Sequence, residues 1–188
     1  MDADKIKTTI HELLISLGEN PQREGLVETP KRVAKAYQKI LEGYSRNLAD
    51  EIKVFENSAG YDDLIISSGI EFFSICEHHL LPFWGHATVA YIPDKTIIGL
   101  SKLSRAVDIY ARRLQDQERI TTQVADELMR LLKPKGVAVM LDASHFCNII
   151  RGVEKKDSSM RTLIFRGVMK DNESLQMKFL MMAQTATK

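Results

Sequence analysis

Disulfide frameworks, membrane spans and a strong net charge are all missing from this sequence. The chain has only two cysteines, Cys76 and Cys147, in 188 residues. A disulfide-stabilised secreted scaffold needs more cysteines, so we expect a buried or metal-binding role for these two. No apolar run approaches the roughly 20 residues that span a bilayer, and residues 1–5 lead into an amphipathic helix, not a signal peptide. We therefore expect a cytoplasmic protein without a membrane partner.

The formal net charge of +1 gives no global attraction to nucleic acid, so any anion site must be local. A composition of 44% hydrophobic and 27% charged residues is typical of a soluble globular protein. No repeat or linker divides the chain. We expect one domain over 1–188, with an N-terminal helical part (1–60) and a sheet-and-helix catalytic part (61–188).

Hydrophobic spacing predicts helices at both ends of the chain and, between them, two groups of strands separated by two further helices. Helices are expected over roughly 3–17, 29–43, 102–114, 117–132 and 171–180, with Thr29, Ser101 and Asp171 as N-caps. Strands are expected over 64–76, 85–92, 96–98, 136–141, 145–153 and 162–169. This order predicts an α+β fold with helices on one face of an antiparallel sheet. The uncovered face suggests a homo-oligomer.

Histidine and cysteine gather in two clusters, Cys76-Glu77-His78-His79 and His145-Phe146-Cys147. Residues 145 and 147 would point to one face of a strand, whereas Cys76 and His79 converge only if the chain bends after Cys76. Two thiolates and one imidazole (Cys76, His79 and Cys147) leave the fourth tetrahedral position of Zn²⁺ for water, as in catalytic zinc sites. Fe²⁺ would use the same ligands.

His78 and His145 lie beside these ligands, and an unperturbed pKa of about 6.5 suits them for general acid and base catalysis. The alternative is that both cysteines are small buried hydrophobes and the histidines are satisfied polar groups. Because the two clusters hold every cysteine of the chain, the metal interpretation is favoured.

Two predicted helix starts carry cation pairs spaced i,i+3, so each pair shares a face. Cations at a helix N-terminus oppose the dipole, and a bound anion would offset that cost. A further cation follows the second cluster by four residues. The candidate anion-binding residues are Arg32, Lys35, Lys102, Arg105 and Arg151. For any single one of them, a solvated surface charge is the commoner case.

Gln117-Glu118 opens a predicted helix. A glutamate in the first turn complements the helix dipole, and this structural role is the simpler interpretation. A carboxylate can also accept paired hydrogen bonds from the N1–H and amino group of guanine. The two interpretations of Glu118 both stay open at this point.

Taken together, the motifs resemble those of the GTP cyclohydrolase I family, in the same order. They are Thr29-Pro30-Lys31-Arg32-Val33-Ala34-Lys35, Cys76-Glu77-His78-His79-Leu80, Gly99-Leu100-Ser101-Lys102-Leu103-Ser104-Arg105, Gln117-Glu118-Arg119, and His145-Phe146-Cys147 with Arg151-Gly152. The resemblance covers about residues 6–180. It implies a tunnelling fold, with sheets joined into five-subunit barrels, two rings forming a decamer and active sites at subunit interfaces.

The resemblance further implies conversion of GTP and water to 7,8-dihydroneopterin triphosphate and formate, a first step toward tetrahydrofolate or related pterins. Zinc on Cys76, His79 and Cys147 would activate water toward C8 of guanine, while His78 and His145 would move protons. By position, the implied substrate contacts are Glu118 with Gln117 for guanine, Ser101 near the ribose, and Lys102, Arg105, Arg151, Arg32 and Lys35 for the triphosphate.

Three departures from the family pattern are Asp116, the stretch 159–163 and His86. They bear on substrate preference and rate more than on reaction type.

Two other hypotheses stay open. One is a purine- or pterin-binding relative that has lost turnover, and the other is a structural zinc protein, which would need a fourth protein ligand.

Overall fold

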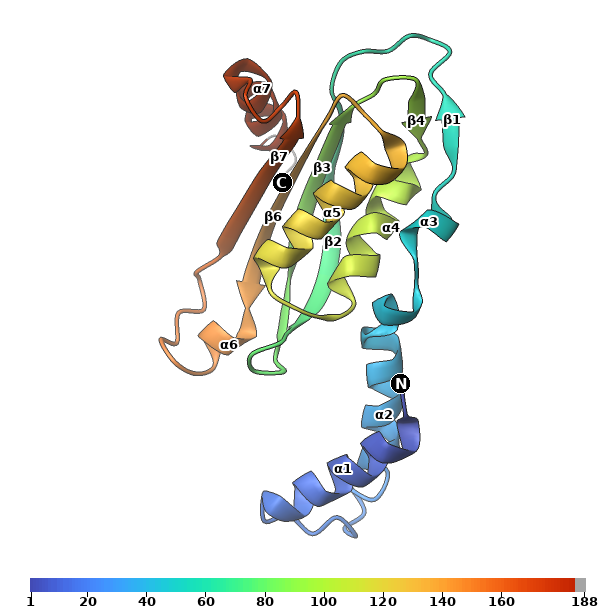
Figure 1. The fold of residues 1–188 in the computed structure, drawn as a ribbon. Helices are drawn as coiled ribbons and strands as arrows, with labels where there is room; N and C mark the ends of the chain where they lie inside the picture. Colours follow the sequence, from blue (N-terminus) through green and yellow to red (C-terminus); the bar gives the residue numbers. More distant parts are fainter. Residues whose placement is uncertain (185–188) are drawn as a thin grey trace.

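The computed structural model describes residues 1–184 as an α+β arrangement (Figure 1). In chain order the elements are α1 (Ala3–Ser16), α2 (Thr29–Ile40), the 3-10 helix η1 (Glu42–Ser45), α3 (Leu48–Glu51), β1 (Val54–Glu56), β2 (Ile65–Cys76), β3 (Pro82–Ile92), β4 (Thr96–Ile98), α4 (Leu100–Ala111), β5 (Leu114–Gln115), α5 (Gln117–Leu132), β6 (Gly136–His145), α6 (Phe146–Ile149), β7 (Met160–Gly167) and α7 (Glu173–Gln184). The α+β class predicted from the sequence is confirmed.

The central sheet has the strand order β5-β2-β3-β6-β7, and β1 pairs with β4 in a separate two-stranded sheet. Its strands are antiparallel except β5, which runs parallel to β2 at the edge. The register sets Cys76 beside Gln115 and Phe83 opposite His145. The end of β2, the start of β3 and the end of β6 therefore meet at one end of the sheet.

Helices α4 and α5 cover one face of the sheet (Figure 1). Every second residue of β6, namely Val137, Val139 and Leu141, is fully buried in the core cluster that these helices share with the sheet. This follows from the period-2 geometry of a strand, which sends alternate side chains to opposite faces. The predicted layer of helices on the sheet is thus confirmed. Packing of α5 on β6 and β7 places the start of α5 next to the sheet.

The second face of the sheet is covered at one end, which corrects the prediction of helices on one face only. There α7 packs its buried Phe179 against Ala138. Toward the other end the same face is open, and the side chains of Phe73 and Trp84 are 59% and 36% exposed.

Helices α1 and α2 pack against each other and project from the rest of the chain (Figure 1). No residue of α1 is buried, and Leu13, Ile15 and Leu17 all stay exposed. Among the residues that the structure describes, no helix is both long and apolar enough to cross a bilayer. The division of the chain at residue 60 stays a prediction. Strand β1, before residue 60, pairs with β4, after it.

Three predicted helix starts need correction by about one residue. Thr29 is the first residue of α2 and Ser101 the second residue of α4, whose N-cap is Gly99. At α7 the capping oxygen belongs to Asn172 and not to the predicted Asp171. At α2 and α4 no side chain caps the free N–H groups, so the sequence locates these helix starts only to within one or two residues.

Candidate metal centre and its surroundings

The first two ligand-type side chains lie at a tight turn that follows β2. The backbone N–H of Cys76 donates to the Leu81 carbonyl (2.8 Å), and the Leu80 N–H donates to the Cys76 carbonyl (2.9 Å). Leu80 takes a φ of +55°, which an L-residue adopts only at some conformational cost. The chain therefore folds back on itself, and the predicted bend after Cys76 is present. His79 lies within this turn.

The third ligand-type side chain comes from a different element. Strand β6 pairs with β3 up to His145, whereas its pairing with β7 ends earlier, at Ala143. With no strand left to pair with, the chain turns into the short helix α6, which carries Cys147. The prediction of a strand over 145–153 is therefore wrong, and Arg151 lies beyond α6, not on a strand.

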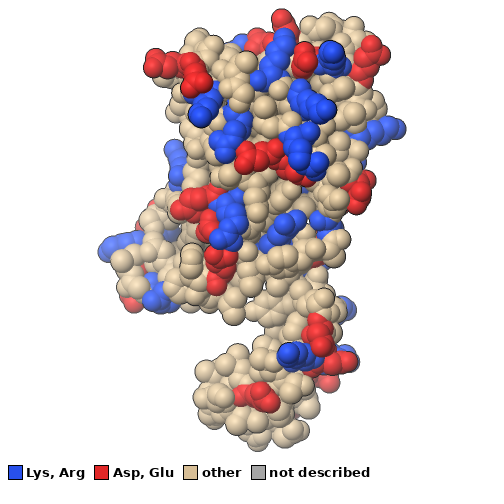
Figure 2. Space-filling model, viewed as in Figure 1, with Lys and Arg blue, Asp and Glu red and all other residues tan. Residues whose placement is uncertain are grey.

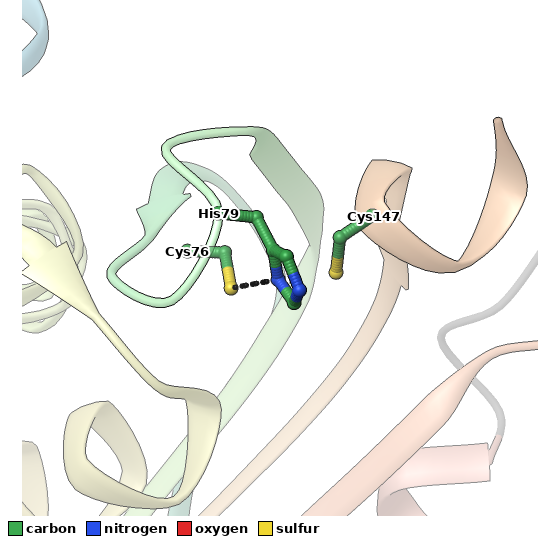
Figure 3. A group of neighbouring side chains, drawn as sticks. All are labelled: Cys76, His79 and Cys147. Atoms are coloured by element: carbon green, nitrogen blue, oxygen red, sulfur yellow. Dashed lines mark hydrogen bonds between the residues drawn. The ribbon is translucent and has the colours of Figure 1, made fainter. Parts of the chain in front are cut away.

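The side chains of Cys76, His79 and Cys147 point toward one another from these two segments (Figure 3). Their ligand atoms all lie within 4.8 Å of one another, and Cys76 Sγ is 3.6 Å from His79 Nδ1. Sulfur and nitrogen ligands on a tetrahedral Zn²⁺ would be about 3.5–3.8 Å apart. In the described part of the chain no other such group occurs. The spacing and the donor set fit zinc.

The electrostatics of the two thiols also fit a cation. Burial raises the pKa of the Cys147 thiol, and the neighbouring Cys76 raises that pKa further, while Arg151 opposes the shift. Two adjacent thiolates repel each other in a partly buried site, so without a cation between them the Cys147 thiol favours the neutral form. A divalent metal removes this obstacle because it binds thiolates and releases their protons.

His145 is held on two sides. Its ring is stacked on Phe83, with 4.6 Å between centroids and 5° between planes. Its Nε2 lies 2.9 Å from Gln117 Oε1. Burial lowers the pKa of His145, and the nearby Glu118 carboxylate partly offsets that shift. His145 is thus kept in the neutral form at pH 7, in which one ring nitrogen accepts a proton.

His78 lies on the exposed side of the turn, with its Nδ1 3.8 Å from Cys76 Sγ. The neighbouring Glu77 forms a two-pronged ion pair with Arg119 of α5. That hydrogen bond to Arg119 holds the pKa of Glu77 below its usual range. The pair ties the turn that carries His78 and His79 to the start of α5.

Asp116, one of the departures from the family pattern, has a structural role. It is the N-cap of α5, and its Oδ1 accepts a hydrogen bond from the Arg119 backbone N–H at 2.7 Å. Its Oδ2 also lies 2.8 Å from the Arg119 guanidinium. Asp116 therefore helps to hold Arg119 in place for its pairing with Glu77. His86, another departure, lies exposed on the open face of the sheet.

The predicted purine contacts differ in burial. Glu118 is exposed in the first turn of α5, where its carboxylate is available to a ligand. The Gln117 side chain is only 1% exposed, and its amide nitrogen lies close to the Met160 carbonyl and the Thr162 hydroxyl. Phe83 and Thr162 could not be predicted from local pattern as neighbours of the site, because both contacts depend on strand pairing.

The cations of α4 do not lie beside the metal centre in the same chain. Ser101 and Lys102 stand in the first turn of α4 and Arg105 in its second turn, while the end of α4 leads into β5, which pairs with β2 at Cys76. At 1.5 Å per residue, Lys102 lies about 14 Å and Arg105 about 9 Å before that end of the helix.

Most of the predicted anion-binding cations lack a carboxylate partner. Arg105 pairs with Glu51 (3.2 Å). Within residues 1–184, no ion pair involves the other four, which are Arg32, Lys35, Lys102 and Arg151. On the face seen in Figure 2, charges of both signs are interspersed, so no broad basic surface is present there. Unpaired cations can accept a bound anion without first breaking an ion pair.

These features define an α+β protein with a Cys-His-Cys candidate metal centre where two strands of its sheet end. Residues 6–184 match the sequence family described as GTP cyclohydrolase I, and the chain belongs to this family. Proteins named GTP cyclohydrolase 1 from Brucella canis, Brucella suis and Brucella abortus are each 49% identical to it over 180 residues, which cover 95% of this chain and 84% of theirs.

Among solved structures, the apo form of an archaeosine synthase described as QueF-Like superposes on part of the chain. The TM-score is 0.46 and the sequence identity 15%, over 55% of this chain and 93% of that one.

Proposed function

We propose that this chain is a hydrolase that opens the imidazole ring of GTP at C8 and yields 7,8-dihydroneopterin triphosphate and formate, as a first step toward pterins. The observation that carries the proposal is the convergence of Cys76, His79 and Cys147 at the end of the sheet, in a chain that belongs to the GTP cyclohydrolase I family. The expected cytoplasmic location stays a prediction.

Cys76, His79 and Cys147 would hold Zn²⁺, to which their donor atoms and spacing are suited. When bound, zinc lowers the pKa of a water ligand to about 7 and so supplies a nucleophile at neutral pH. Three protein ligands leave room for that water, which distinguishes this site from a closed structural zinc site.

The chain's own residues would handle protons and orientation. Release of C8 as formate breaks both of its bonds to ring nitrogens, and each leaving nitrogen needs a proton. The exposed His78 and the half-buried His145 flank the metal ligands and would transfer these protons. Glu118, exposed at the start of α5, would accept hydrogen bonds from the guanine N1–H and amino group.

The triphosphate contacts would come from more than one copy of the chain. Lys102 and Arg105, with Ser101 near the ribose, lie roughly 9–14 Å before the end of α4 that leads to the metal centre of their own chain. We expect them to serve the metal centre of a second copy. The exposed apolar side chains of α1 and the open sheet face support self-association, which we expect to be a decamer of two five-membered rings. Arg151, Arg32 and Lys35 would complete the phosphate site.

The test is to incubate zinc-loaded protein with GTP and to measure formate together with the fluorescence of the oxidised pterin. Equal amounts of both products are expected, and His145→Ala should keep its oligomeric state while both products disappear. GTP binding without either product would overturn the proposal and favour a purine-binding relative. A fully active His145→Ala variant would contradict the proton-transfer role.

A further inference from the structure

Gln117 is the first residue of α5, and its buried side chain joins this helix to strands β6 and β7. Its Nε2 lies 3.1 Å from the Leu141 carbonyl oxygen, 2.9 Å from the Met160 carbonyl oxygen and 3.1 Å from Thr162 Oγ1. Its Oε1 lies 2.9 Å from His145 Nε2. The amide is therefore clamped between strands β6 and β7 on one side and a candidate catalytic histidine on the other.

The protons of this network have one consistent arrangement. Backbone carbonyls only accept hydrogen bonds, so the amide atom that faces Leu141 and Met160 must be the NH₂ group. Thr121 Oγ1 donates to the backbone carbonyl of Gln117 (2.8 Å). The hydroxyl of Thr162, whose Oγ1 lies 2.6 Å from Thr121 Oγ1, therefore donates to Thr121 and accepts from the side-chain NH₂ group of Gln117. The opposite amide orientation would set an oxygen against two carbonyl oxygens, and this excludes it.

With the NH₂ group committed in this way, Oε1 of Gln117 is an acceptor. The ring nitrogen beside it, His145 Nε2, must then carry the hydrogen. In a neutral imidazole the other nitrogen, Nδ1, then holds the lone pair. Phe83, stacked flat on the ring, keeps the imidazole in the plane in which this hydrogen bond forms.

We propose that Gln117 is a positioning residue that holds His145 as the Nε2–H tautomer, so that Nδ1 is the nitrogen that accepts and returns protons. The proposal rests on the proposed function, in which His145 transfers protons, and it gives Gln117 a different part from the purine contact that the family resemblance implied. The network includes the Met160 carbonyl and Thr162 Oγ1, so the stretch 159–163 helps to hold Gln117 against His145.

The direct test is the ¹⁵N spectrum of His145 in the zinc-loaded oligomer, recorded by solid-state NMR on protein labelled at histidine at pH 8. The His145→Ala spectrum assigns the signal. A protonated, pyrrole-like Nε2 and an unprotonated, pyridine-like Nδ1 are expected. The opposite pattern would overturn the proposal whatever the activity, so a failure of the proposed function can be told apart from a failure of this one.

The second test is Gln117→Met, which keeps the side-chain length but removes the acceptor. We expect the tautomer preference to be lost and kcat to fall by about 10²-fold, with KM for GTP changed less than about threefold. The control, Gln123→Met, removes another amide of α5, one that accepts from Gln115, and should leave kcat and the His145 signal unchanged. A raised KM at unchanged kcat would assign Gln117 to substrate binding instead and overturn the proposal. Should Gln117→Met not fold, the wild-type spectrum alone decides.

Discussion

The imidazole of His145 lies flat on the ring of Phe83, and the two residues are direct cross-strand partners of β6 and β3. Phe83 itself is fully buried. One side chain therefore serves both the core and the candidate site, and its replacement should affect both stability and turnover.

Phe83→Ala should lower the free energy of unfolding by about 3–5 kcal/mol, because it removes a buried aromatic ring and leaves a cavity. Urea unfolding at fixed protein concentration measures the loss. Phe83→Leu keeps most of the volume but not the flat surface under His145. It should cost less stability while still reducing kcat. Unchanged kcat in Phe83→Leu would show that stacking does not matter for catalysis.

Cys147→Ser should lose bound metal and activity together, because a hydroxyl is a poor zinc ligand at neutral pH. Metal content by mass spectrometry and formate release are measured on the same preparation. The control is His86→Ala, a histidine on the open sheet face outside the metal group, which should keep its metal. Normal activity at normal metal content in Cys147→Ser would refute the ligand assignment.

Arg119→Ala should weaken metal binding by about 10–100-fold, because partners that orient metal ligands have effects of this size. It removes the ion pair to Glu77 that ties the metal-binding turn to α5. The effect on stability should stay below about 1 kcal/mol, since the pair is partly exposed. Arg130→Ala breaks a similar two-pronged pair with Glu127 on the same helix and should leave metal affinity unchanged. Chelator competition measures both variants.

Stability should depend on pH through Glu51. The hydrogen bond from Arg46, with a second from Arg105, lowers the pKa of Glu51 from 4.5 to about 2. Because the folded-state pKa is lowered, the carboxylate stabilises the fold above pH 4.5, and this contribution is lost as the pH falls toward 2. Glu51→Gln should therefore be less stable than the wild type at pH 7. The difference between the two in free energy of unfolding should become smaller below pH 4.5. A gap that does not change with pH would contradict this pairing.

Subunit complementation should reveal whether α4 serves a neighbouring copy. His145→Ala and Lys102→Ala are each expected to be inactive alone. Co-expressed in equal amounts, the two variants should regain about a quarter of wild-type activity. An intact site needs His145 from a Lys102→Ala chain and Lys102 from a neighbouring His145→Ala chain, and random mixing gives this combination at about one interface in four. Oligomers isolated through two different affinity tags provide the sample. No recovery in verified mixed oligomers would show that the two residues act within one chain.

Much of the fold could be predicted from local pattern. Alternation and helical periodicity located the long elements, such as β2 and α5, because burial of one face leaves a repeating signal in the sequence. Among the elements of four residues or fewer, β4 was predicted, whereas η1, α3, β1, β5 and α6 were not. Such short segments form because the surrounding structure demands them, and they carry no periodicity of their own.

The sequence by itself determined the chemistry that is available: two thiols and nearby imidazoles, cations at helix starts and a carboxylate at the start of α5. Only the tertiary structure decided which of these groups meet. Cys147 reaches Cys76 and His79 from α6, beyond the end of β6, while Gln117 reaches His145 through the packing of α5 on β6 and β7. The α4 cations Lys102 and Arg105 lie roughly 9–14 Å before the end of α4 that leads to this site. These distances follow from strand register and helix packing, which involve residues remote in sequence and so leave no local pattern to read.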